Sequence, residues 1–196
     1  MLVLAIFTPT QANVLETKVY VSPATYTVPS IGSTFSVNVS IQGVTNLKGW
    51  EFKLYYPNGV LNGTAVTEGA FLKSGGVNTF FIVADFTDGY NATQGLASLA
   101  CLRITPDMTG VDGNGVLATI TFNTTSNAGP ESLHLADVNL SDPNVTKIPY
   151  IKVDGEVTVL PEFSTTSILL VTMMMTLAIV VLRKKNVDHK RVFRTA

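Results

Sequence analysis

The chain has 196 residues, of which 46% are hydrophobic and 14% are charged, whereas soluble globular proteins average about 25% charged residues. Residues 13–162 contain seven basic and thirteen acidic residues, and residues 183–196 contain six basic residues and one acidic residue. The acidic main part excludes a basic nucleic-acid-binding protein, and the change of charge along the chain indicates a membrane between the two parts.

The first twelve residues have features of an export signal. Leu2–Phe7 is a short apolar stretch, and Thr10-Gln11-Ala12 is similar to the small-x-Ala cleavage site of a signal peptide. The positively charged start of such a signal is absent. Residues 1–12 are therefore expected to be a signal peptide that is truncated or weak, and the alternative is an ordinary first β-strand.

Residues 13–160 are expected to form one all-β domain. Hydrophobic and polar residues alternate over 35–41, 50–56 and 116–122, which is typical of strands that bury one face and expose the other. Their spacing predicts about nine short strands in an antiparallel β-sandwich or jelly roll. Turn sequences separate the strands, among them Pro57-Asn58-Gly59, Asp112-Gly113-Asn114-Gly115 and Asp154-Gly155.

The end of the chain is expected to cross a membrane once. After a short linker at 161–163, residues 164–182 carry no charge, and nineteen helical residues span about 28 Å, close to the thickness of a bilayer core. The alternative is a buried core helix. Three basic residues follow directly: Arg183, Lys184 and Lys185. They are expected to stop the transfer of the chain through the membrane. Clustered basic residues remain on the cytoplasmic side of a membrane. Residues 183–196 are therefore predicted to be a cytoplasmic tail, and the β-domain is predicted to lie at the cell surface.

Six Asn-x-Ser/Thr sequons occur, all within the β-domain: Asn38, Asn62, Asn91, Asn123, Asn139 and Asn144. Asn38 and Asn123 fall on the polar side of their strands, so a glycan there would not disturb the core. The other four lie in or near expected turns. The sequons predict a glycosylated surface, or else they arise by chance in a sequence rich in Thr and Asn.

The reactive residues are too few for most kinds of catalysis. Cys101 is the only cysteine, so no disulfide forms within the chain and this residue is expected to pack as a small hydrophobic side chain. His134 is the only histidine of the β-domain, and its place between Leu133 and Leu135 predicts a side chain that points outward. No catalytic residue and no cofactor are assigned, and we expect a protein that is not an enzyme.

The one candidate metal site is in a single loop that holds three oxygen-bearing side chains: Asp107, Asp112 and Asn114. Such oxygens can bind Ca²⁺. Their spacing does not match the twelve-residue Ca²⁺ loop between helices, so ordinary turn residues are the alternative.

Four residues are candidates for a binding face. Glu51, Lys53 and Tyr55 share the polar side of one expected strand, and Tyr90 lies in an expected loop. Aromatic rings in such positions can stack on a sugar or pack against a protein. Trp50 alternates with Phe52, so it is expected to be part of the core.

Five motif segments follow one another between residues 17 and 160: Gly32–Val39, Asn46–Pro57, Gly95–Ile104, Asp112–Phe122 and Ile148–Val159. Their order resembles that of the cohesin family, the scaffoldin-type receptor modules that bind dockerins. The resemblance implies a nine-stranded jelly roll, related to cellulose-binding sandwich modules, that binds a dockerin through one sheet face without chemistry. Tyr56-Pro57-Asn58 stands where Tyr-Asp-Pro is commoner in the family.

The chain end is similar to the archaeal PEF-CTERM sorting signal, with Pro161-Glu162-Phe163, an apolar span and basic residues. Eleven residues follow Lys185, so sorting-enzyme cleavage and a plain single-pass anchor both stay open. Together these features predict a membrane-anchored cell-surface module for a dockerin-like partner. The alternatives are a carbohydrate-binding domain that takes polysaccharide, as in polysaccharide breakdown, and a structural component of the cell envelope.

Overall fold

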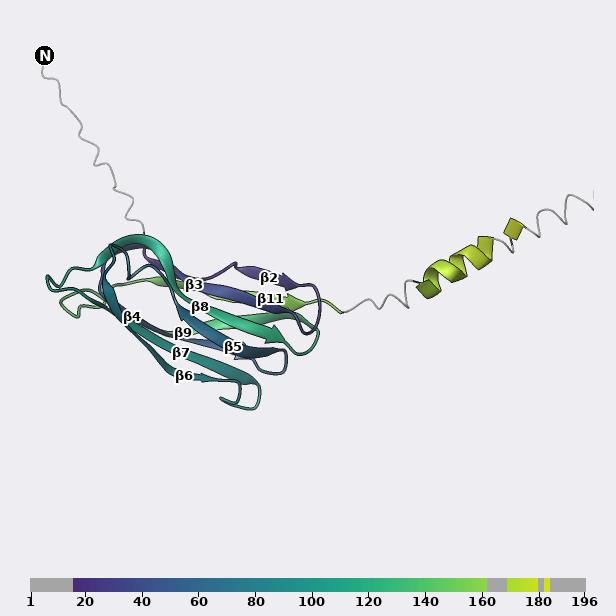
Figure 1. Ribbon diagram of the computed structural model, residues 1–196, viewed down its shortest axis with the longest axis horizontal. Helices are drawn as coiled ribbons and strands as arrows, with labels where there is room; N and C mark the ends of the chain where they lie inside the picture. The colour runs from purple at the N-terminus through teal and green to yellow at the C-terminus, as the bar shows by residue number, and fades with distance from the viewer. Residues whose placement is uncertain (1–15, 162–168, 180–181, 184–196) are drawn as a thin grey trace, which may run out of the picture. The chain divides into compact units, whose positions relative to one another are not determined.

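Eleven β-strands in two sheets form the main part of the chain (Figure 1). The computed structural model describes residues 16–161, 169–179 and 182–183. One sheet has the strand order β10-β1-β3-β8-β5, and the other has the order β2-β11-β9-β4-β7-β6. In chain order the strands are β1 (Lys18–Ser22), β2 (Thr25–Val28), β3 (Thr34–Leu47), β4 (Gly49–Pro57), β5 (Leu61–Glu68), β6 (Asn78–Thr87), β7 (Gln94–Ile104), β8 (Val111–Thr124), β9 (Ala128–Ser141), β10 (Ile151–Val153) and β11 (Gly155–Val159).

The first and the last strand are each divided between the two sheets. Pro23 and Ala24 separate β1 from β2, and Asp154 separates β10 from β11. Proline has no N–H to donate to a neighbouring strand, so it ends β1. Gly155 crosses close to β1, where an added Cβ would lie 2.6 Å from the Val21 side chain. Counting each divided strand once gives the expected nine.

The purely antiparallel arrangement expected from the sequence is wrong at the chain ends. β1 pairs with β10, and β2 pairs with β11, in parallel. The first and the last strand of the domain run side by side in the same direction, which produces both parallel pairs. The remaining strand pairs are antiparallel, as the alternation of short strands and turns indicates.

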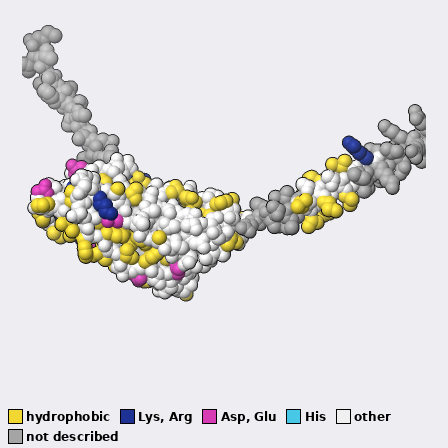
Figure 2. Space-filling view, in the orientation of Figure 1, with side chains coloured by type: hydrophobic (Ala, Val, Ile, Leu, Met, Phe, Trp, Pro, Cys, Tyr) yellow, Lys and Arg dark blue, Asp and Glu magenta, His cyan; other side chains and the backbone are white. Residues whose placement is uncertain are grey.

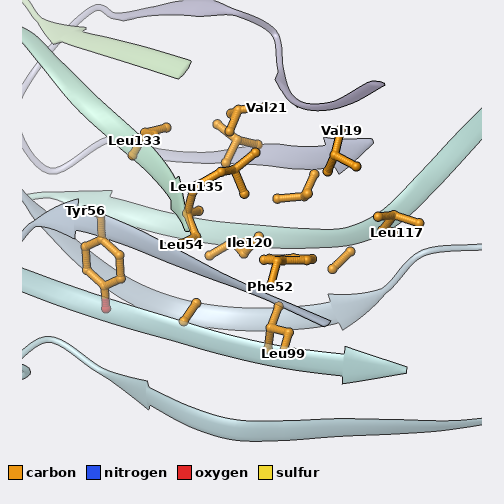
Figure 3. Packing of buried hydrophobic residues seen from close by; sticks show 14 of the residues in the cluster. Val19, Val21, Phe52, Leu54, Tyr56, Leu99, Leu117, Ile120, Leu133 and Leu135 are labelled. Atoms are coloured by element: carbon orange, nitrogen blue, oxygen red, sulfur yellow. The ribbon is translucent and has the colours of Figure 1, made fainter. Parts of the chain in front are cut away.

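Hydrophobic side chains from both sheets meet between them and form the core (Figure 3). Phe52 and Leu54 of β4 are buried there with Ile120 of β8, as the alternation in both strands predicts. Trp50 is 4% exposed, so its expected place in the core is confirmed. Tyr56 is also buried, and its hydroxyl donates to a carboxylate oxygen of Asp88 at 2.8 Å.

The chain forms two compact units, Met1–Leu160 and Pro161–Ala196. In the second unit residues 169–179 are helical, and the hydroxyls of Thr172 and Thr176 donate back to backbone carbonyls three residues earlier. Within the described residues, no helix combines the length and the apolar character needed to cross a membrane.

Several expectations concern residues outside the described part of the chain. These are the signal peptide at 1–12, Glu162 and Phe163 of the sorting motif, the start of the apolar segment up to residue 168, and the tail from Lys184 onward, including Lys185.

Candidate binding face

The outer face of the six-stranded sheet is centred on β4, which lies between β9 and β7. Tyr55 is opposite Leu96 of β7 and His134 of β9, and Lys53 is opposite Ser98 of β7. These side chains alternate with the core residues of their strands, so they point away from the core. We define the binding face as the outward residues of four strands, without the buried Leu96: Phe80, Ile82 and Asp85 of β6; Ser98, Ala100 and Leu102 of β7; Glu51, Lys53 and Tyr55 of β4; and His134, Ala136, Asp137, Asn139 and Ser141 of β9.

A shallow trough runs across the middle of the binding face. Its floor consists of small residues, Ser98, Ala100 and Gly49, and one depression in it has a volume of about 510 Å³. Glu51 and Lys53 of β4 border the trough on one side and β6 borders it on the other, and these two strands are two strand spacings apart, about 10 Å at about 4.8 Å each. An α-helix with its side chains is about 10–12 Å wide, so a helix could lie along the trough and rest on its borders.

Charged groups along one side of the trough, on β4 and β9, are held in fixed pairs. Lys53 Nζ lies 2.8 Å from a carboxylate oxygen of Asp137, and the Asn139 amide donates to Glu51. The hydrogen bond and the charge of Asp137 raise the pKa of Lys53, and the same contact lowers the pKa of Asp137. Both groups therefore stay ionised over the ordinary pH range and offer a partner one positive and one negative group.

Three rings gather at one end of the binding face. The ring centroids of Tyr55 and Tyr90 are 5.3 Å apart, those of Tyr55 and His134 are 6.4 Å apart, and His134 Nδ1 lies 2.6 Å from Asp154. Hydrogen bonding to Tyr90 raises the pKa of Tyr55. The expected outward direction of His134 is confirmed. Its place beside Tyr55 depends on the pairing of β4 with β9, for which the sequence gives no local signal.

The other end of the binding face is apolar. A cavity of about 400 Å³ lies beyond Leu102, between the turn before β8 and the turn after β9, and Ile104, Met108 and Val145 are among its lining residues. Met108 and Val145 have φ angles of 56° and 62°, and they are 57% and 83% exposed. A left-handed backbone is unfavourable for a non-glycine residue, above all for a β-branched one, and such strain is concentrated at functional sites.

The three Ca²⁺ candidates have other hydrogen-bond partners. Asp112 accepts from the backbone N–H of Asn46, Asn114 accepts from that of Gly43, and Asp107 accepts from Thr109. In residues 16–161, 169–179 and 182–183, no three His, Cys, Asp or Glu side chains form a group suited to a metal ion. The oxygens stabilise the turn beside β8, a role that the sequence also allows.

The sequons are distributed over both sheets and two turns. Asn38, Asn62 and Asn123 lie on the outer face of the five-stranded sheet, where Asn62 is directly opposite Asn123. Asn139 belongs to the binding face. The exposed Asn91 and Asn144 lie in the turns after β6 and β9.

Cys101 is buried, as expected, and its thiol donates to Glu68 at 3.3 Å. Burial and the neighbouring Glu68 raise the pKa of this thiol to about 12. A thiol that stays protonated at neutral pH is a poor nucleophile, so Cys101 is a core residue.

Comparison with known proteins identifies the family. The sequence matches the model of the Cohesin domain family over residues 19–159. No curated protein sequence matches the chain.

Solved structures share the fold. A non-cellulosomal cohesin from the archaeon Archaeoglobus fulgidus is 19% identical with a TM-score of 0.56, and the match covers 74% of this chain and 91% of that one. The cohesin CaCohA2 from Clostridium acetobutylicum is 21% identical with a TM-score of 0.60, covering 74% and 90%. The OlpA cohesin from Clostridium thermocellum, solved in complex with a dockerin, is 13% identical with a TM-score of 0.60, covering 74% and 99%. From its family match and its two-sheet fold, the chain belongs to the cohesin domain family.

Proposed function

We propose that this cohesin domain binds a dockerin-like protein module on its binding face and catalyses no reaction. The observation that carries the proposal is the shallow trough floored by Ser98, Ala100 and Gly49, with an apolar cavity at one end. Large exposed hydrophobic side chains border it, among them Phe80 and Leu102. Similar cohesins from Acetivibrio cellulolyticus and Clostridium thermocellum are described in complex with dockerins, which supports the same kind of partner here.

We further propose that residues 164–182 anchor the protein at the cell surface, with the β-domain outside. The support is the uncharged sequence of this segment and the basic residues that follow it from Arg183. Fractionation of cells that make the tagged chain tests this, because the protein should be recovered with the membranes. Recovery in the aqueous fraction contradicts it.

The binding proposal is tested with two matched arginine variants and a panel of purified dockerin modules. Ala100→Arg fills the trough and should weaken binding about 30-fold or more, because loss of a central contact costs about 2 kcal/mol. Ser36→Arg adds the same side chain on the exposed outer face of β3 and should leave the affinity unchanged. Isothermal titration calorimetry gives both affinities. Equal affinities for the two variants, or binding to none of the dockerins, contradict the proposal.

A second candidate function is direct carbohydrate binding at the rings of Tyr55, Tyr90 and His134. Rings close together on an exposed face can stack on sugar rings. Affinity electrophoresis in soluble polysaccharides tests it. Retardation that is lost in Tyr55→Ala and Tyr90→Ala, and kept in Ala100→Arg, would favour this function over protein docking.

A further inference from the structure

Strand β6 is an open edge of the sandwich. It pairs with β7 on one side, and among the described residues no strand pairs with its other side (Figure 1). The other three edge strands, β2, β5 and β10, have 4, 8 and 3 residues, whereas β6 has 10. The longest edge of the domain is therefore available for pairing with another strand.

The sequence of β6 lacks the usual protection of an edge strand. Natural edges carry charges, prolines or bulges that prevent pairing, but residues 78–84 contain no charge and no proline. Phe80, Ile82 and Val83 are 58%, 40% and 45% exposed. A bulge between Val83 and Asp85 overlaps only the last residues of this stretch, and Asp85 follows it. Hydrophobic side chains reach the surface of the body near this edge (Figure 2).

We propose that β6 pairs with β6 of a second copy of this chain, antiparallel, about a twofold axis at Phe81. Directly opposite residues of paired strands point to the same side, so only registers that place outward residues opposite outward residues are possible. An axis at Phe81 places Phe80 of each copy opposite Ile82 of the other copy, so the dimer contains this pair twice. Aromatic and β-branched side chains are favourable cross-strand neighbours.

Other registers fit less well. An axis at Ile82 places Phe80 opposite Ala84 of the second copy, and an axis at Phe80 places Ile82 opposite Asn78. With the axis at Phe81, Asp85 lies opposite Val77 of the second copy, so the two negative charges do not face each other. The self-complementary sequence and the absence of charge in the paired stretch identify a second copy as the occupant.

The pairing joins two six-stranded sheets into one and leaves both binding faces on the same side, because the twofold axis is perpendicular to the sheet. Phe80 and Ile82, at the β6 border of each binding face, then pack against each other where the two faces meet. This inference does not depend on the identity of the partner, and it holds whether the binding face takes a protein or a glycan.

The register is tested by disulfide trapping in the full-length chain in detergent. We prepare Phe80→Cys and Ile82→Cys separately, mix them and oxidise. The mixture should give a disulfide-linked dimer about ten times more efficiently than either variant alone, because only the mixed pair is directly opposite. Equal yields from all three samples, or none, overturn the register. The unchanged chain is the control for Cys101, which is buried.

The dimer is tested by sedimentation velocity on the full-length chain. The unchanged chain should be dimeric at tens of micromolar, and Ile82→Lys should be monomeric with an unchanged circular dichroism spectrum. Ala65→Lys on the edge strand β5 is the matched control and should stay dimeric. A monomeric unchanged chain, or a dimeric Ile82→Lys, overturns the proposal. Dockerin binding by a monomer would show that the pairing fails while the proposed function holds.

Discussion

Glu68 at the end of β5 is a charged side chain placed where three strands and a loop meet. It accepts hydrogen bonds from Thr79 and Cys101, and Lys73 Nζ lies 2.7 Å from its other oxygen. Burial raises the pKa of Glu68, but the contacts with Lys73, Thr79 and Cys101 together lower it below its ordinary value. The ionised form therefore stabilises the fold.

Glu68→Gln should lower the free energy of unfolding by about 1–3 kcal/mol at pH 7, because it removes the charge that these donors share. A group whose pKa is lowered in the folded state stabilises above its unfolded pKa, and this contribution is lost as the pH falls through the folded pKa. The difference between the two proteins should therefore disappear in acid. Urea unfolding at pH 7 and at pH 3 measures it, and a difference that is the same at both pH values contradicts the account.

Cys101 should be unreactive in the folded protein. Its thiol is buried and its pKa is raised to about 12, so the thiolate is scarce at pH 8. A colorimetric thiol reagent should label it at least a hundred times more slowly than it labels Ile82→Cys on the exposed face of β6. In denaturant the two cysteines of that variant should react equally fast. Rapid labelling of Cys101 in the native protein would show that the core opens at β7.

At the scale of elements, a buried arginine helps to hold the segment between β5 and β6. The Arg103 guanidinium of β7 donates to the backbone carbonyls of Leu72 and Ser74 at 2.6 and 2.9 Å. Phe71 and Leu72 enter the core beside it. The segment carries the chain from one sheet to the other, so its attachment decides how firmly the edges β5 and β6 are joined.

Arg103→Met should keep the apolar stem but lose both hydrogen bonds, and it should destabilise the domain by about 2–4 kcal/mol because the buried carbonyl of Leu72 and the partly buried carbonyl of Ser74 lose their donor. Limited proteolysis should then cut first in Lys73–Val77. Arg103→Lys is the informative companion, since it restores one donor and should recover part of the stability. Unchanged proteolysis of Arg103→Met contradicts the anchoring role.

The left-handed residue Val145 in the turn after β9 should lower the stability of the domain and strengthen partner binding. Val145→Gly relieves a left-handed backbone and should raise the free energy of unfolding by about 1 kcal/mol, because glycine adopts this conformation freely. It also removes an exposed apolar side chain from the cavity and should weaken partner binding several-fold. Thermal melts and calorimetry measure the two effects. Gly32→Val, at φ 77° with open space around its Cβ, is the reverse control and should destabilise.

How far the sequence predicts each element depends on the range of the interaction. Alternation within β4 correctly assigns Trp50 to the core and Tyr55 to the outer face, because side-chain direction is a local property. The meeting of Tyr55 with Tyr90 and His134 requires the pairing of β4 with two strands far away in the sequence. No local pattern encodes that register, so the ring cluster and the trough emerge only in three dimensions.

At the scale of the whole domain, the two outer faces differ in chemistry. The five-stranded sheet presents Ser, Thr and Asn side chains, such as Ser36 hydrogen-bonded to Thr121 and Asn38 hydrogen-bonded to Thr119. The six-stranded sheet presents large apolar side chains, fixed charges and rings. Polar strands satisfied by their own neighbours need no partner, whereas exposed apolar groups are typical of interaction sites. The division explains why we assign binding to the six-stranded sheet.

The interior position of the last strand determines how the domain responds to mechanical load. β11 lies between β2 and β9 and runs parallel to β2, with the ladder Glu156–Val159 against Thr25–Val28. A pull on the carboxyl end along β11, with the rest of the domain held by a captured partner, loads these hydrogen bonds in shear, so that they must break together instead of one after another. A pull along β11 should therefore meet more resistance than a pull that opens the same ladder one hydrogen bond at a time.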